Sequence, residues 1–282
     1  MFTTNPFSEL AELISPLAMQ IYVVVMILLV IGGTILDMIH KKSAQYFFEN
    51  SKKAQKNAVR KVSSGEKAGI AVKTLTNEIL TSGEFKNPRR RISHLFTMYG
   101  FILFVVSTAI MIFGYADSAA TPTILPVLWH VGALMLCFGG YWFWFFIRVD
   151  VAAEGNPWYR VVHADLFILS LLSTATFALI WSALQSAGVA IWQTLFFALF
   201  ILSSTVLFGG VLWSKFAHMF FKPAAAFQKR ITQADGSQEN LPDVPDLTDP
   251  EVQKRYPDIP MYMGENPPNM GLGIKREAPN HY

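Results

Sequence analysis

Five long apolar stretches alternate with polar or broken segments along this chain. Each is long enough to cross a membrane as a helix, because about 20 helical residues cover roughly 30 Å of hydrocarbon. The fourth and fifth share one uncharged run that is too long for a single helix, so we divide it at residues 185–188. The stretches lie between Glu12 and Asp37, between Arg91 and Asp117, from near Val127 to Arg148, and on either side of the division in the run from Asp165 to Lys215.

This pattern predicts an all-α integral membrane protein with five transmembrane helices. The composition agrees, because 52% of the 282 residues are hydrophobic and only 15% are charged, whereas soluble chains carry about 25% charged residues. A cleavable signal peptide is the alternative for the first stretch, but acidic Glu9 and Glu12 stand where such a peptide is basic. We expect four regions: a membrane helix in residues 1–40, a basic helical loop in 41–91, a four-helix membrane bundle in 92–222 and an acidic, proline-rich tail in 223–282.

The charges predict how the helices are oriented. All 23 Lys and Arg residues fall in segments that five crossings place on one side of the membrane. By the positive-inside rule that side is cytoplasmic, which leaves the N-terminus outside and the C-terminus inside.

Two polar segments would face the cytoplasm. Residues 40–93 hold 13 Lys or Arg against four Glu. Helix-compatible runs occupy residues 43–61 and 66–81, and Ser63 with Glu66 has the spacing of a capping box. Their lysines would rest on anionic lipid headgroups or, alternatively, dock an acidic partner.

The tail has the opposite charge. Residues 231–282 hold nine Asp or Glu against four Lys or Arg, and eight prolines interrupt them. We expect this segment to form no helix or core of its own and to fold along a soluble subunit, with a passive tail as the alternative. No phosphate-binding glycine loop or nucleophile motif is present, and we expect no nucleic-acid partner. The single cysteine, Cys137, excludes a disulfide framework or a thiolate cluster within the chain.

Four histidines lie at predicted helix ends. His94 opens the second helix, His163 opens the fourth and His218 closes the fifth, so these three share the cytoplasmic depth, while His130 lies at the outer depth as an interfacial residue. Bis-histidine haem ligation needs two imidazoles at equal depth on facing helices. Small residues in the second and fifth helices would either line a haem slot or allow close helix packing; these are Gly100, Ser107, Gly114, Ser203, Ser204, Gly209 and Gly210.

Two short motifs carry a family resemblance. Residues 91–101 (RISHLFTMYGF) and 213–219 (WSKFAHM) resemble the first and last helices of a cytochrome b domain. Nitrate reductase gamma subunits, heterodisulfide reductase membrane subunits and the quinone-interacting oxidoreductase of sulfate reducers share this domain. The likeness covers roughly residues 90–225. Within it, the basic loop, five spans and acidic tail most resemble the membrane anchor of adenylylsulfate reductase in sulfur-oxidising bacteria.

The resemblance implies one haem, where diheme members of the family have two. Their second ligand pair falls on Phe104 and Phe200 here, so only His94 and His218 carry over, as axial ligands of the iron of one haem b near the cytoplasmic face. His163 is an alternative ligand or part of a quinone site.

Near the start of the fourth helix, donors and charges gather as a candidate quinone site. Tyr159, Arg160, His163 and Asp165 would supply hydrogen bonds and a proton route, although ordinary anchoring at the membrane surface is the alternative.

Together these features predict a membrane anchor that passes electrons to quinone without substrate chemistry of its own. The resemblance implies that it sits in the bacterial inner membrane. It also implies that the loop in 41–91 and the tail in 223–282 bind the flavin and iron–sulfur subunits of adenylylsulfate reductase. The alternative is a purely structural, haem-free anchor of that enzyme.

Overall fold

The computed structural model contains helices and no strand among the residues that it describes. It describes residues 1–255 except residues 12, 41, 84, 86, 116–120, 149–156, 215, 217, 240 and 242–249, and at His218 it describes the backbone alone. Residues 256–282, where we expect contacts with a soluble partner, lie outside this set.

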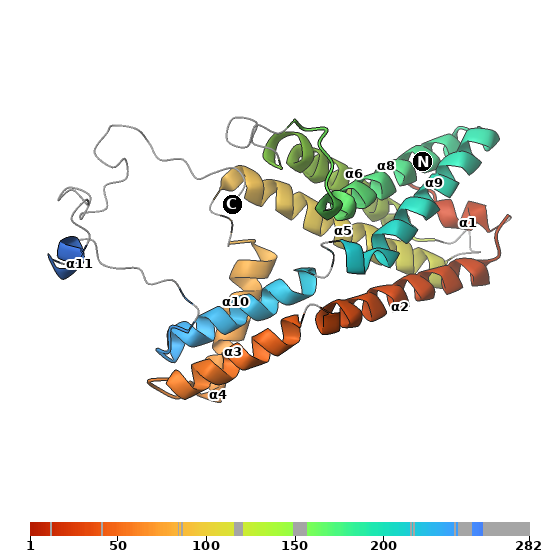
Figure 1. Cartoon of the computed structure of the whole chain (residues 1–282). Helices are drawn as coiled ribbons and strands as arrows, with labels where there is room; N and C mark the ends of the chain where they lie inside the picture. The colour runs from red at the N-terminus through yellow and green to blue at the C-terminus, as the bar shows by residue number, and fades with distance from the viewer. Residues whose placement is uncertain are drawn as a thin grey trace.

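Five helices in the described part of the chain are long and apolar enough to cross a membrane, which confirms the predicted spans. Figure 1 shows them gathered on one side of the molecule. They are α2 (Pro16–His40), α5 (Pro88–Gly114), α6 (Ile124–Trp142) with the π-helical turn η2 (Phe143–Ile147), the 3-10 turn η3 (His163–Asp165) with α8 (Leu166–Ser186), and α9 (Ala190–Gly209).

Helix ends differ from the prediction where local chemistry decides them. Asn87 accepts hydrogen bonds from the backbone N–H groups of Arg89 and Arg90, so α5 starts at Pro88. Helix α2 continues past Asp37, whose side chain is buried. Helix α6 starts at Ile124, because Pro126 falls in its first turn, where a missing N–H is tolerated.

The four spans α5, α6, α8 and α9 pack in chain order, and α2 lies against α9 and α5. Glycines bring α5 and α6 together. A Cβ on Gly132 would lie 2.8 Å from the carbonyl oxygen of Gly100, and one on Gly139 would lie 2.6 Å from that of Ser93. Such close backbone approach is typical of small residues between membrane helices.

A short helix, α1 (Pro6–Leu10), covers one end of the spans, which we call the α1 end. Asn5 donates to the carbonyl oxygen of Tyr115, and Gln185 donates to the carbonyl oxygen of Pro6 at 3.0 Å. The ring of Phe7 is buried among the spans. The N-terminal segment is therefore packed against the spans.

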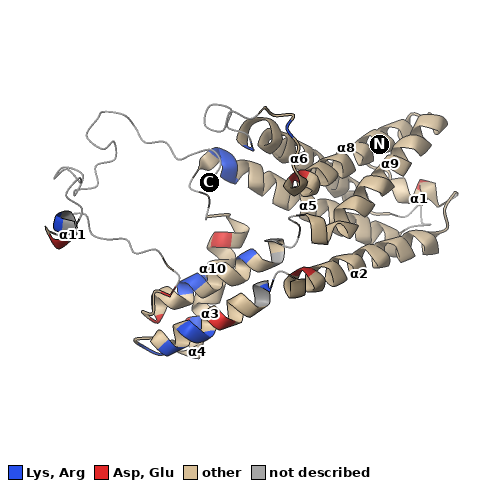
Figure 2. Ribbon diagram, viewed as in Figure 1, with Lys and Arg blue, Asp and Glu red and all other residues tan. Residues whose placement is uncertain are grey.

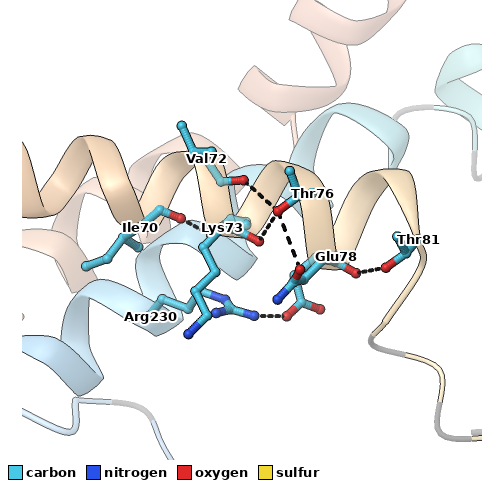
Figure 3. Close-up of polar contacts among 9 residues, drawn as sticks. Ile70, Val72, Lys73, Thr76, Glu78, Thr81 and Arg230 are labelled. Atoms are coloured by element: carbon cyan, nitrogen blue, oxygen red, sulfur yellow. Dashed lines mark hydrogen bonds and ion pairs between the residues drawn. The ribbon is translucent and has the colours of Figure 1, made fainter.

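At the opposite end, which we call the arm end, a layer of helices projects away from the spans (Figure 1). This arm consists of α3 (Ser43–Asn57), α4 (Ser64–Thr74) with the π-helical turn η1 (Leu75–Leu80), and α10 (His218–Ala234). The Ser63 side chain accepts from the N–H of Glu66, which confirms the predicted cap of α4. Arg230 of α10 pairs with Glu78 of η1 (Figure 3).

The arm joins two segments that we treated as separate. Asp235, just after α10, accepts through its backbone oxygen from the N–H groups of Val59 and Arg60, and Asn57 donates to Glu239. The start of the tail therefore folds onto the basic loop. A short helix, α11 (Pro250–Arg255), also shows that the prediction of a tail without helix is wrong at that point.

Candidate functional site

His94 lies at the arm end, half-buried in the second turn of α5. Its Nδ1 is 2.9 Å from the hydroxyl oxygen of Ser82, and its ring centroid is 4.9 Å from that of Phe85. A histidine whose Nδ1 is held by a second group is oriented for ligation through Nε2. The sequence signal located His94 but not these two partners, which lie in the loop before α5.

His218 does not close the fifth membrane helix, as we expected. Helix α9 ends at Gly209, a 3-10 turn (η4, Val211–Trp213) follows, and His218 begins the separate helix α10. Gly210 permits this break, because a Cβ there would lie 2.5 Å from the carbonyl oxygen of Val206. Ser214 is extended, and Phe216 then turns into the core, with 3% of its surface exposed.

Side chains near the starts of α5 and α10 nevertheless both reach Phe85. The ring of Phe85 contacts the His94 ring on one element and the Lys222 ammonium, 5.1 Å from the ring centroid, on the other. Lys222 lies one helical turn after His218. The structure therefore brings the two helix starts that carry the predicted ligands to the same end of the molecule.

Phenylalanine rings fill the core next to this site. Phe216 lies 5.6 Å from Phe167 and 6.0 Å from Phe208, measured between ring centroids. Phe101, two turns after His94 on α5, lies 6.3 Å from Phe208. These phenylalanine rings therefore occupy the core where α5, α8 and α9 meet.

At the α1 end, the two positions where the resemblance implies a missing second ligand pair contact one another. Phe104 of α5 and Phe200 of α9 are buried, with ring centroids 6.4 Å apart. Trp129 stacks on Phe104 at 5.1 Å, and Trp181 stacks on Phe200 at 5.7 Å. The side chains fill the space between these helices, so the residues present do not fit a second haem.

Two of the small residues, Gly100 and Ser204, lie in contacts between helices. Gly100 faces Gly132 of α6, and Ser204 of α9 lies 2.9 Å from the hydroxyl of Tyr22 of α2. The hydroxyl of Ser107 donates to the carbonyl oxygen of Leu103 in its own helix, and a Cβ on Gly114 would meet nothing within 4 Å.

The predicted quinone cluster separates into a buried and an exposed part. Asp165 is buried in an ion pair with Arg148, and it also accepts from the N–H of Val162 at 2.9 Å. Arg148 lies over the Trp144 ring at 4.2 Å. Tyr159, Arg160 and His163 are exposed. Sequence reasoning did not single out Arg148, because a single arginine at the end of a span is ordinary.

His130 is not an interfacial residue, and that prediction is wrong. Its side chain is fully buried, because it links two spans: Nδ1 lies 2.7 Å from the carbonyl oxygen of Pro126, and Nε2 lies 2.9 Å from the hydroxyl of Ser182 on α8. Both ring nitrogens therefore have partners, and Phe2 covers the ring. His130 cross-links α6 and α8.

Comparisons with protein-family models, with curated proteins and with solved structures find no match for this chain. The structure therefore defines only a class of protein: a helical protein whose described part has five helices able to span a membrane. Its more particular assignment depends on the motifs and the site.

Proposed function

We propose that this chain anchors a soluble oxidoreductase to the membrane and passes its electrons to quinone through one haem b, held by His94 and His218. The observation that carries this proposal is the contact of the Phe85 ring with both His94 and Lys222, because bis-imidazole ligation needs the two helix starts side by side. The Ser82 hydroxyl at Nδ1 of His94 is the kind of second partner that metal-binding histidines have.

The haem, when bound, would supply a one-electron relay between the soluble enzyme and quinone. The chain's own residues orient the ligand and receive the quinone. Ser82 holds the His94 ring, while the exposed Tyr159, Arg160 and His163 offer hydrogen-bond donors for a quinone carbonyl. Asp165 is engaged by Arg148, so its contribution is to fix the start of α8.

The partner in this proposal is adenylylsulfate reductase, on the family resemblance stated above. Its flavin and iron–sulfur subunits would bind the arm and tail on the cytoplasmic side of the bacterial inner membrane, where the positive-inside rule puts the basic segments. Formation of adenylylsulfate from sulfite and AMP releases two electrons, and these with two protons convert quinone to quinol.

A haem-free anchor of the same enzyme is the second candidate. It is favoured by the packing of Phe101, Phe208 and Phe216 beside the site and by the use of Gly100 and Ser204 in helix contacts. In this case the arm and the tail alone provide the function, and electrons reach quinone by another carrier.

The chain reconstituted in vesicles with purified adenylylsulfate reductase and a quinone tests both candidates. We expect sulfite and AMP to drive quinone reduction only when the chain is present. Retention of the reductase on the vesicles without quinone reduction would support the haem-free anchor. Failure of the reductase to bind vesicles that contain the chain would contradict both.

A consequence follows from the closed α1 end. Since the aromatic side chains around Phe104 and Phe200 fit no second haem, electrons have no relay across the membrane. We therefore expect turnover in sealed vesicles, with electrons delivered on the arm side, to move little charge. A membrane potential that builds up in step with quinone reduction would contradict this expectation.

A further inference from the structure

The arm carries its lysines away from the spans. Helices α3 and α10 contact one another, and Figure 1 shows both beyond the end of the spans and pointing away from them. Lys52, Lys53 and Lys56 follow the start of α3 at Ser43 by nine to thirteen residues. At 1.5 Å per residue they therefore stand about 14–20 Å along the helix from its start, where α3 follows the first span.

This separation decides between lipid and protein as the partner of these lysines. A lysine at an anionic membrane surface gains about 1 kcal/mol, and the attraction decays over a Debye length of about 8 Å in physiological salt. At 14 Å less than about a fifth of it remains. Anionic lipid therefore does not account for basic residues at the outer part of the arm.

The acidic side chains of the arm do not neutralise these lysines. Glu66 pairs with Arg60, and Glu78 pairs with Arg230 (Figure 3). Glu49, one turn before Lys52 and Lys53 on α3, accepts a hydrogen bond from Gln45 at 2.8 Å. Among the residues that the structure describes, Lys52, Lys53 and Lys56 form no ion pair. In the ribbon of Figure 2, Lys and Arg positions are coloured along α3 and its neighbours at the outer part of the arm, with acidic positions between them.

The face is also held in a fixed position. The turn after α3 is tied to the end of α10, because the backbone oxygen of Asp235 accepts from Val59 at 2.9 Å and from Arg60 at 3.1 Å. Asn57 adds a hydrogen bond to Glu239 at 3.0 Å. A basic surface on a rigid support loses little conformational entropy when it binds, and it draws an oppositely charged partner from a distance.

Resting on the proposed function, we infer that the α3 face formed by Lys52, Lys53 and Lys56 is the docking site for an acidic surface of the soluble reductase. Lipid and the chain's own acidic tail are the competing occupants. The face selects its partner by charge, at a height above the membrane that lipid headgroups do not reach.

The test measures binding of purified adenylylsulfate reductase to the full chain in nanodiscs of neutral lipid. We expect K52E/K53E/K56E to raise the dissociation constant at least about tenfold at low salt, with a smaller effect at high salt. The matched control, K67E/K73E/K229E, makes the same change in charge on exposed lysines of α4 and α10 and should have a much smaller effect.

The outcomes separate the inference from the proposed function. If wild-type chain does not bind the reductase, the proposed function fails. If it binds and the α3 variant binds equally well, the docking site is wrong. A difference that arises only in anionic nanodiscs would assign the face to lipid. If the difference between wild type and the α3 variant disappears when residues 242–282 are removed, the tail is the occupant of the face. If both triple variants weaken binding equally, the effect comes from net charge and not from this face.

Discussion

The two ends of the membrane helices differ in what fills them. At the α1 end, stacked aromatic rings and the N-terminal helix close the core. His130 is the one titratable side chain at its centre among the described residues, and both of its ring nitrogens are hydrogen-bonded. At the arm end, a helix break and a loop bring His94, Ser82 and the start of α10 together. One set of helices thus combines a closed, tightly packed end with an end that carries the candidate site.

The largest effect should follow from removing a ring at the α1 end. Trp181 is fully buried and contacts Phe7, Phe197 and Phe200. Trp181→Ala should lower the free energy of unfolding by about 3–5 kcal/mol, because it leaves a large cavity. Denaturant titration in detergent micelles measures this.

Two controls accompany that variant. Trp181→Phe should cost clearly less, because the ring remains and the lost indole N–H has no hydrogen-bond partner among the described residues. Trp158→Ala at the arm end should cost within about 0.5 kcal/mol, because Trp158 is 52% exposed. Equal losses for Trp181 and Trp158 would erase the contrast between the ends.

A smaller effect should follow from separating α5 and α6 near the arm end. A Cβ on Gly139 would lie 2.6 Å from the carbonyl oxygen of Ser93 and 2.7 Å from the hydroxyl of Thr97, so Gly139→Ala should cost about 1–3 kcal/mol. Gly114→Ala is the matched control, because nothing lies within 4 Å of its added Cβ. A control as destabilising as Gly139→Ala would mean that helix propensity or lipid contact, not the close approach, sets the cost.

Replacing Ser82 should have an effect of about 1 kcal/mol. Ser82→Ala removes the hydrogen bond to Nδ1 of His94 and leaves the backbone at a φ of 49°. Ser82→Gly removes the same bond but suits this φ, so it should be less destabilising than Ser82→Ala. Unfolding free energies of the two variants give this order, and the reverse order would show that the positive φ does not set their difference. Wild-type stability in both variants would show that the hydroxyl contributes nothing.

The smallest effect should be a pH dependence in the arm. The hydrogen bond from Arg60 lowers the pKa of Glu66. A carboxyl with a lowered pKa stabilises the fold above its unfolded pKa of about 4.3 and loses that contribution as pH falls through its folded value. Glu66→Gln should flatten the thermal stability of the arm between pH 6 and about pH 3 slightly. An unchanged pH profile would show that the exposed pair contributes nothing.

The sequence predicted the spans well and the site only in part, for physical reasons. Twenty uncharged residues in lipid leave a helix as the only structure that satisfies the backbone, so composition determined the five helices. The end of α9 was missed because the break at Gly209 and Gly210 lies inside an uncharged run. The burial of His130 was missed because its partner, Ser182, comes from a different span.

The contact between Phe104 and Phe200 is a second feature that the sequence predicted only in part. Family resemblance marked both positions as places where ligands are missing, but only the packed helices show Trp129 and Trp181 filling the space. Likewise, the arm depends on contacts between segments far apart in the chain, such as Arg230 with Glu78. No local pattern encodes such contacts.

An absorption spectrum of the purified chain, oxidised and then reduced, tests the central claim most directly. We predict a b-type spectrum with bis-imidazole ligation that is lost in His94→Ala and in His218→Ala but retained in His163→Ala. Wild-type protein without haem, or haem content unchanged in both ligand variants, would contradict the proposed electron carrier.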